Sequence, residues 1–195
     1  MKNHVLNYFN KNFETIQNLD YKKIEKLAKA LSLIKNNKGR IFLIGVGGSA
    51  ANCSHMVNDL RKICELESYT PTDNVSELTA RINDDGWDSS FANWLKISNL
   101  NKKDALFILS VGGGNKKLKV SVNLIKAIDF AIKRKAKIYG IVGKKDGYTY
   151  KKGNLIIAIP ETDKNLITPI SESFQSVIWH CLVSHPLLKR KPTKW

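Results

Sequence analysis

The sequence has few cysteines and few prolines, and it lacks a long hydrophobic run. Its 195 residues include three cysteines, Cys53, Cys64 and Cys181, which form no CxxC pair, so we expect no disulfide framework. Residues 1–23 carry charged and amide side chains throughout, without the uninterrupted apolar segment of a signal peptide or a membrane span. We therefore expect a cytoplasmic protein that does not enter the membrane.

Acidic residues are also scarce, because 32 lysines and arginines stand against 17 aspartates and glutamates and give a net charge of +15. A surface of this charge attracts polyanions, so nucleic acid is one alternative partner. However, the lysines are spread over every expected helix, and aromatic residues do not alternate with them as base-stacking platforms would. We interpret the lysines as solvated surface that also favours small phosphorylated substrates.

The length suits one α/β domain with a substantial core. Two amphipathic helices are expected first, the second capped by Asp20 and ended by Gly39. Short apolar runs that stop at glycine or proline are typical of strands buried on both faces of a parallel sheet. Such runs occupy residues 41–45, 105–110, 137–143 and 154–160. Helical patterns separate most of these runs, which predicts repeated β-α-β units with helices on both faces of the sheet.

The remaining segments are assigned from local signals. Between residues 65 and 101 we expect helices at 76–82 and 89–97, with a turn at NDDGWD between them. In the last helix, Thr168 can act as the cap, Pro169 fits the first helical position, and Pro186 ends the helix. Residues 187–195 are expected to form a loose basic tail.

The N-terminus carries an apolar stripe made of Leu6, Phe9 and Phe13. A single small domain has little surface of its own with which to bury this stripe. We therefore expect residues 1–38 to serve in oligomerisation, most simply in a tetramer.

A glycine-rich loop, GVGGS at residues 45–49, joins an expected strand to an expected helix. Glycines there let the backbone approach a ligand, and the first amides of the helix point at it, which suits a phosphate. The spacing fits neither the dinucleotide fingerprint nor a Walker loop. The alternative is a tight turn in which Ser49 is an ordinary helix cap.

A second loop of this kind, SVGGGN at residues 110–115, follows the next buried strand. Both loops should emerge at the carboxyl edge of the sheet, where ligands of open parallel sheets bind. Hydroxyl, backbone amide and ammonium groups of the second loop could hold a phosphate. The substrate-binding residues predicted from the two loops are Gly47, Gly48, Ser49, Ser110, Gly112, Gly113, Gly114, Asn115 and Lys116.

Three further polar residues lie in helical patterns. His55 and Asp59 are four residues apart and so share one face of a helix, where a simple surface pair is the commoner outcome. His180 lies in the last helix beside Trp179, and a histidine of the core is the alternative there.

Several segments together resemble the phosphoheptose isomerases of the sugar-isomerase (SIS) family. GVGGSAANCSHMVNDL is similar to their GNGGS–helix segment, NDDGWDSSF at residues 83–91 resembles their ND-x-G-aromatic segment, and His180 matches in the last helix. The resemblance covers residues 39–185. It implies a three-layer α/β/α fold with a five-stranded, flavodoxin-like parallel sheet. It also implies a homotetramer packed partly through the N-terminal helices, with active sites shared between subunits.

The resemblance also implies site roles. His55, Asp59, Glu172 and His180 would bind a divalent metal, for which two imidazoles and two carboxylates favour zinc. Asp59 and His180 would be catalytic, and Asp84 and Glu172 would contact the substrate. Asp59 and Glu172 stand where the family has glutamate and glutamine, and Val46 replaces an asparagine of the first loop. Glu172 and His180 are eight residues apart, about 12 Å along a regular helix.

The activity implied is aldose–ketose isomerisation of a heptose phosphate, such as sedoheptulose 7-phosphate to D-glycero-D-manno-heptose 7-phosphate. A base would move a proton between C1 and C2 through an enediol. The alternative is a SIS-fold module without catalysis, which binds a sugar phosphate as a regulatory ligand or binds another protein.

Overall fold

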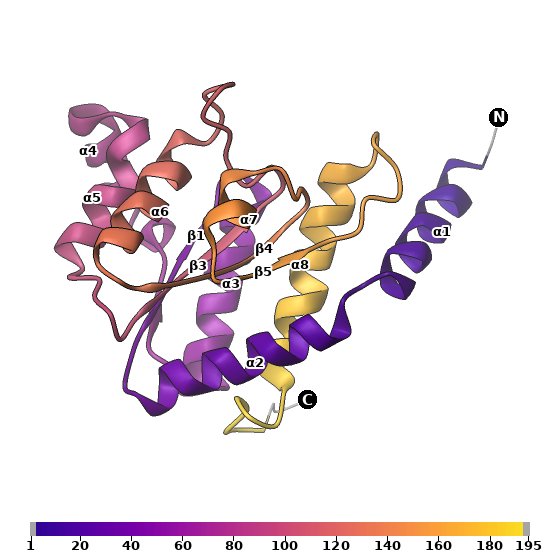
Figure 1. Ribbon diagram of the computed structural model, residues 1–195, viewed down its shortest axis with the longest axis horizontal. Coiled ribbons are helices and arrows are strands. Elements are labelled where there is room, and N and C mark those ends of the chain that lie inside the picture. The colour runs from indigo at the N-terminus through magenta and orange to yellow at the C-terminus, as the bar shows by residue number, and fades with distance from the viewer. Residues whose placement is uncertain (1–2, 193–195) are drawn as a thin grey trace.

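The computed structural model describes residues 3–192 and contains one five-stranded parallel sheet (Figure 1). The strand order is β2-β1-β3-β4-β5, with every neighbouring pair parallel, which is the flavodoxin-like order expected from the sequence. The strands are β1 (Ile41–Ile44), β2 (Ser68–Tyr69), β3 (Ala105–Ser110), β4 (Lys137–Val142) and β5 (Leu155–Ala158).

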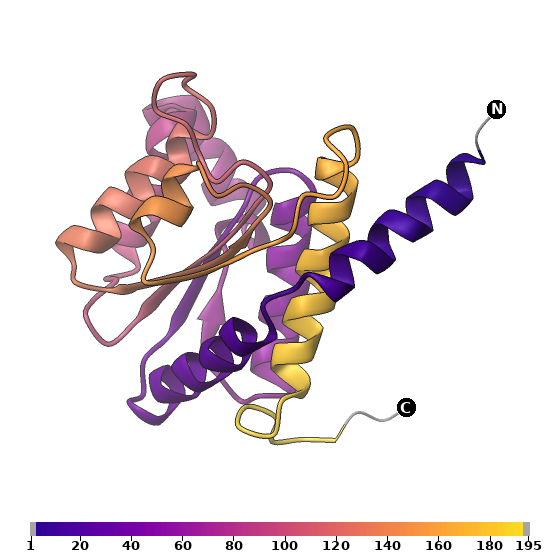
Figure 2. The same cartoon turned by 45° about the vertical axis from the view of Figure 1, so that its right-hand side comes forward.

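Helices cover both faces of the sheet and complete three layers (Figure 1). One face carries α2 (Tyr21–Asn36), α3 (Gly48–Lys62) and α8 (Ile167–Ser184). The other side carries α4 (Val75–Asp85), α5 (Ser90–Ile97), α6 (Val122–Lys133) and α7 (Tyr148–Lys152), with a short 3-10 turn at Trp87–Ser89. A second 3-10 turn, Pro71–Asp73, lies against α3, where Ser54 Oγ donates to Asp73 Oδ1 at 2.8 Å. Figure 2 shows that α1 (His4–Gln17) projects away from this body.

The core lies between the sheet and each helix layer, because successive side chains of a strand point to opposite faces. In β1, Ile41 and Leu43 join the cluster under α2, α3 and α8. Phe42 and Ile44 join the cluster under α5 and α6. All four residues are buried, as the continuous apolar run predicted for a strand covered on both faces.

The structure adds elements that the pattern did not reveal. The strand β2 has two residues and α7 has five, which is too short for any periodicity to be visible. The expected turn at NDDGWD starts later than predicted, because Asn83–Asp85 complete α4. Gly86 then breaks the helix with a φ of +80°, a backbone conformation that favours glycine.

The last helix begins two residues earlier than predicted, so Thr168 does not cap it. Leu166 is the capping residue, and Thr168 and Pro169 are the second and third helical residues. Asp163 shapes the entry instead, since its carboxylate accepts from the Asn165 amide and its carbonyl accepts from the Leu166 amide. Proline is tolerated here because the first helical amides have no partner within the helix. The predicted stop is confirmed, since α8 ends at Ser184.

The expected loose tail is attached to the domain over its first half. Leu188 is fully buried, and the amides of Arg190 and Lys191 both donate to the Ile63 carbonyl oxygen. Lys191 also pairs with Glu65 at 3.0 Å. The tail is therefore held as far as Lys191, and residues 193–195 lie outside the described part of the chain. Within residues 3–192, no helix is both long and apolar enough to cross a bilayer.

Candidate functional site

Two helices on the same face of the sheet, α3 and α8, carry the polar residues predicted for catalysis. Asn52 of α3 contacts Glu172 and Ser176 of α8, and His55 lies next to His180 further along, so the helices run in the same direction. Both start near the carboxyl edge of the sheet, since α3 follows β1 directly and the start of α8 packs near the end of β4. The predicted residues therefore lie along one seam between two helices.

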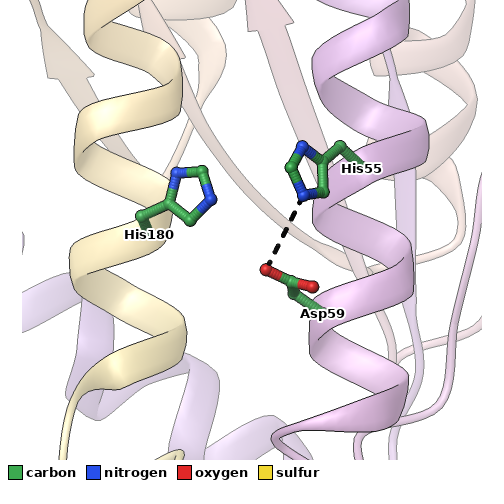
Figure 3. A group of neighbouring side chains, drawn as sticks. All are labelled: His55, Asp59 and His180. Atoms are coloured by element: carbon green, nitrogen blue, oxygen red, sulfur yellow. Dashed lines mark ion pairs between the residues drawn. The ribbon is translucent and has the colours of Figure 1, made fainter. Parts of the chain in front are cut away.

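Three of these residues come together in the middle of the seam. His55 Nε2 lies 4.0 Å from Asp59 Oδ2, and the rings of His55 and His180 stand edge to face with centroids 5.3 Å apart. One ligand atom from each residue lies within 4.8 Å of the other two. Figure 3 shows His180 on one helix facing His55 and Asp59 on the other. We call this group the His-Asp-His cluster.

Neighbouring groups orient the cluster. His180 Nδ1 lies 2.8 Å from the Ser176 carbonyl oxygen, which can only accept, so Nδ1 carries a hydrogen and the lone pair of the neutral ring is on Nε2. Asn58 Nδ2 donates to Asp59 Oδ1 at 2.9 Å, and the other carboxylate oxygen, Oδ2, faces His55. The buried indole of Trp179 stacks on the His180 ring, with centroids 3.6 Å apart.

The cluster borders an open cavity of about 740 Å³ between α3, α8 and the C-terminal segment. Asp59 is only 9% exposed, while both histidines are exposed. Three lysines, Lys62, Lys189 and Lys191, also line the cavity and make it attractive to an anionic ligand.

The arrangement decides between the alternatives for these residues. His180 is exposed, and the buried residue of the pair is Trp179, so His180 is not a histidine of the core. His55 and Asp59 are more than an isolated surface pair, because His180 joins them from a second helix. Two nitrogen ligands and one oxygen ligand beside an open cavity fit a catalytic zinc ion, which uses three protein ligands and an open position.

Glu172, the fourth predicted ligand, does not join the cluster within one protomer. Its carboxylate lies at the start of α3, where a Cβ added to Gly48 would be 2.5 Å from Glu172 Oε2. Eight residues of α8, slightly more than two helical turns, separate Glu172 from His180. The four-residue ligand set is therefore wrong for a single protomer, and Glu172 belongs with the first glycine loop.

The first loop has the expected strand–loop–helix form but a different cap. Gly47 caps α3 with a φ of +63° and without a side-chain hydrogen bond. Ser49 is the second helical residue and is 1% exposed, so it is not the helix cap, and its buried side chain does not line an open surface. The first turn of α3 thus presents backbone amides rather than a hydroxyl at the carboxyl edge.

The second loop is held by internal hydrogen bonds. Ser110 Oγ accepts from the Gly113 amide at 2.9 Å, and Thr149 Oγ1 donates to the Gly113 carbonyl oxygen at 2.8 Å. Asn115 exchanges backbone hydrogen bonds with Val120. Ser110 therefore shapes the loop, and Gly112 is the glycine of this loop that is exposed.

Two predicted contacts lie elsewhere. The Lys116 ammonium lies 3.5 Å from Asp129 Oδ2 and 4.4 Å from the Tyr148 ring, contacts that raise its pKa, with the hydrogen bond to Tyr148 as the main cause. Lys116 thus faces α6 and α7 instead of the loop amides. Asp84 is exposed on α4, on the opposite side of the sheet from the cluster.

Sequence reasoning missed Asn52, Asn58 and Ser176. Asn52 and Ser176 had a visible signal, because polar residues recur at helical spacing at positions 52, 55 and 59 of α3 and at 172, 176 and 180 of α8. Such a stripe on two helices indicates a polar seam between them.

Comparisons with known proteins agree with this fold. Residues 5–143 match the SIS domain family. A phosphoheptose isomerase from Helicobacter pylori (strain P12) is 25% identical over 180 residues, which are 90% of this chain and 88% of that protein. One from a Nitratiruptor species is 30% identical over 160 residues, 79% of each chain. The structure of the phosphoheptose isomerase from Neisseria gonorrhoeae shares the fold, with a TM-score of 0.79 and 22% identity over 92% of this chain and 95% of that one. The chain therefore belongs to the SIS domain family, in the group of the phosphoheptose isomerases.

Proposed function

We propose that this protein isomerises a heptose phosphate, with sedoheptulose 7-phosphate and D-glycero-D-manno-heptose 7-phosphate as the ketose and the aldose. The observation that carries the proposal is the His-Asp-His cluster beside a cavity of about 740 Å³. The relatives named phosphoheptose isomerase support the choice of a seven-carbon sugar phosphate. The lysines of the cavity favour an anionic ligand.

We assign transfer of the carbon-bound proton to Asp59. Its carboxylate takes a proton from C1 of the ketose while O2 gains one, which gives an enediol. Return of the proton from Asp59 to C2 and loss of the O1 proton give the aldose, so no net proton is consumed. The Asn58 side chain keeps Oδ1 occupied and directs Oδ2 into the cluster.

The protons on the two oxygens are assigned to His180. Its Nδ1 hydrogen is held by the Ser176 carbonyl oxygen, so Nε2 has the lone pair that accepts or returns a proton. Because the neutral ring has a single lone pair, Nε2 of His180 would hold either this proton or a metal ion.

We propose zinc as the resident ion, held by His55, Asp59 and His180. Such an ion supplies Lewis-acid polarisation of the sugar carbonyl. The donor set fits, since the three ligand atoms lie within 4.8 Å of one another.

We further propose that each active site is shared between protomers. His55 and Asp59 lie 7 and 11 residues after Gly48 on α3, which corresponds to roughly 10 and 16 Å along the helix. The eight bonds from C1 to the phosphorus of a heptose 7-phosphate span only about 9 Å when extended. The separation of Asp59 from the start of α3 along the helix exceeds this length, which favours a phosphate site outside the same protomer's α3. A glycine loop from a second copy supplies the phosphate site.

Assembly through α1 accounts for the required second copy. The helix projects from the domain (Figure 2) and exposes Leu6, Phe9 and Phe13 to solvent by 58–65%. We propose a homotetramer in which these side chains are covered. Sedimentation analysis should give four copies, and a stable monomer at micromolar concentration would contradict the proposal.

The working compartment is proposed to be the cytoplasm. Cys53, Cys64 and Cys181 are all free thiols, which is typical of reducing compartments.

The decisive experiment combines metal analysis with an isomerisation assay on sedoheptulose 7-phosphate. The wild-type protein should contain zinc and convert the sugar. The Asp59→Asn variant keeps the size of the side chain and part of its ligand capacity but removes the base, so turnover should fall by at least about 100-fold while zinc content falls less. Binding of the sugar phosphate without metal or turnover, unchanged by Asp59→Asn, would instead identify a regulatory sugar-phosphate-binding module.

A further inference from the structure

Asn52 links the two helices one turn before the His-Asp-His cluster. Its Nδ2 donates to the Glu172 carbonyl oxygen at 3.0 Å and to Gln175 Oε1 at 3.2 Å, and its Oδ1 accepts from Ser176 Oγ. The contacts of this one side chain on α3 therefore reach three residues of α8. With the amide in this orientation, both its nitrogen and its oxygen take part in hydrogen bonds.

These contacts bear on the cluster because its members come from different helices. His55 and Asp59 follow Asn52 on α3, whereas His180 follows Ser176 on α8 by one turn. The His180 ring is also attached to Ser176, through the hydrogen bond from Nδ1 to the carbonyl oxygen. A shift of α8 along α3 would thus move His180 away from the other two residues.

We propose that Asn52 is a positioning residue that fixes the register of α3 against α8 and so sets the distance from His180 to His55 and Asp59. Its importance for catalysis rests on the proposed isomerase function, whereas the register itself is a property of the fold. Ser176 shares the task, since its hydroxyl bonds to Asn52 and its carbonyl oxygen holds the His180 ring. Groups that orient metal ligands typically change metal affinity or activity by about 10–100-fold when they are removed.

A loss of stability does not distinguish the positioning role of Asn52 from a purely structural one. Gln175 is fully buried, and its Nε2 has no partner among residues 3–192, so removing Asn52 also leaves Gln175 Oε1 unpaired. Lower stability is therefore expected in either case. The test must measure the geometry of the cluster itself.

The variants are Asn52→Leu, which keeps the approximate size without hydrogen bonds, and Ser176→Ala, with Ser176→Thr as the conservative variant that retains the hydroxyl. Ser173→Ala is the matched control, because Ser173 is exposed on α8 and is not one of the residues that hydrogen-bond to Asn52. Each protein is titrated with cobalt(II), whose absorption reports coordination geometry. We expect Asn52→Leu to weaken cobalt binding by about 10–100-fold and to change the spectrum, Ser176→Ala to act in the same direction, and Ser176→Thr and Ser173→Ala to match the wild type.

A metal-free measurement keeps the two proposals separate. The His55 and His180 rings are edge to face at 5.3 Å, so their ring-current effects depend strongly on their relative position. The imidazole resonances of both histidines should shift in metal-free Asn52→Leu and stay unchanged in Ser173→Ala. If wild type binds no cobalt but these resonances shift, the metal assignment fails and the positioning role stands. If Asn52→Leu keeps the wild-type imidazole resonances and the wild-type cobalt affinity, the positioning role is refuted, whatever its melting temperature.

Discussion

The carboxylate of Glu172 lies against Gly48 at the first turn of α3, so closely that a Cβ at position 48 would stand 2.5 Å from Glu172 Oε2. The contact places a negative charge near the positive end of the helix, where it is favourable. The Glu172 carboxylate of α8 therefore occupies the space that a side chain at position 48 of α3 would need. A side chain at position 48 would therefore have to displace the carboxylate of a residue on a helix near the opposite end of the chain.

This contact predicts that the effect of Gly48→Ala depends on Glu172. In the wild-type background the added methyl group displaces the carboxylate and should lower stability. In a Glu172→Ala background the obstacle is gone, and alanine should be neutral or stabilise the helix by up to about 1 kcal/mol. Urea denaturation of the four proteins gives the coupling energy, expected between about 0.5 and 3 kcal/mol. Simple additivity would show that the two residues do not constrain one another.

At the second glycine loop, we expect one substitution to weaken ligand binding without changing the stability of the fold. A Cβ at Gly112 would meet nothing within 4 Å, so Gly112→Val should leave the melting temperature unchanged. If the loop approaches a phosphate, the same variant should weaken the affinity for sedoheptulose 7-phosphate at least about tenfold, measured by calorimetry. Gly113→Val is the contrasting variant, because a φ of +69° should cost it about 1–2 kcal/mol of stability. Unchanged affinity in folded Gly112→Val would remove this loop from the binding site.

The three cysteines should differ in reactivity. Cys53 and Cys64 are fully buried while Cys181 is exposed, so a thiol reagent at about pH 8 should modify one cysteine in the folded protein and three after unfolding. Burial raises the pKa of both buried thiols, that of Cys64 from 9.0 to about 11. Reaction of two or more thiols before unfolding would contradict the observed packing.

The same pKa shift gives a dependence of stability on pH. Between pH 9 and about 11 the unfolded Cys64 thiol loses its proton while the folded thiol keeps it, so the unfolded state binds fewer protons. The contribution of Cys64 to the free energy of unfolding is therefore complete below about pH 9 and decreases as the pH rises towards 11. Urea titrations at about pH 8 and about pH 10 should show a smaller loss of stability for Cys64→Ala than for the wild type.

Asp104 should be the most important acidic residue for stability. It is 2% exposed and accepts hydrogen bonds from the Arg40 guanidinium and backbone amide and from Asn101. Asp104→Ala should destabilise the fold by about 3 kcal/mol, because Arg40 loses a partner in a largely buried site. Lys29→Ala is the control, since its pair with Glu25 is exposed and should contribute less than about 0.5 kcal/mol. Equal effects of the two variants would contradict this ranking.

Local patterns predicted most of the fold. The run at 105–110 became β3 with the same ends, and the Asp20 side chain caps α2 by accepting from the Lys23 amide. These predictions succeeded because a strand buried on both faces and a helix cap depend on residues that are neighbours in the chain. The start of α8 was wrong because Asp163 competes with Thr168 in shaping the turn, and both residues are common at helix entries.

The candidate site was likewise predictable from local patterns only in part. The spacing of His55 and Asp59 on one helix face was readable, because four residues of α-helix make slightly more than one turn. The eight-residue spacing already indicated that Glu172 and His180 lie far apart on one helix. Which of the two lies beside His55, and where Lys116 lies, depends on how α8 and α6 pack on the sheet, which no local pattern contains. Packing brought His180 to the cluster, left Glu172 two turns away against Gly48, and drew Lys116 to Asp129. The residue types and their helical faces are local properties of the chain, whereas the distances between helices arise only when burial of the core fixes their register.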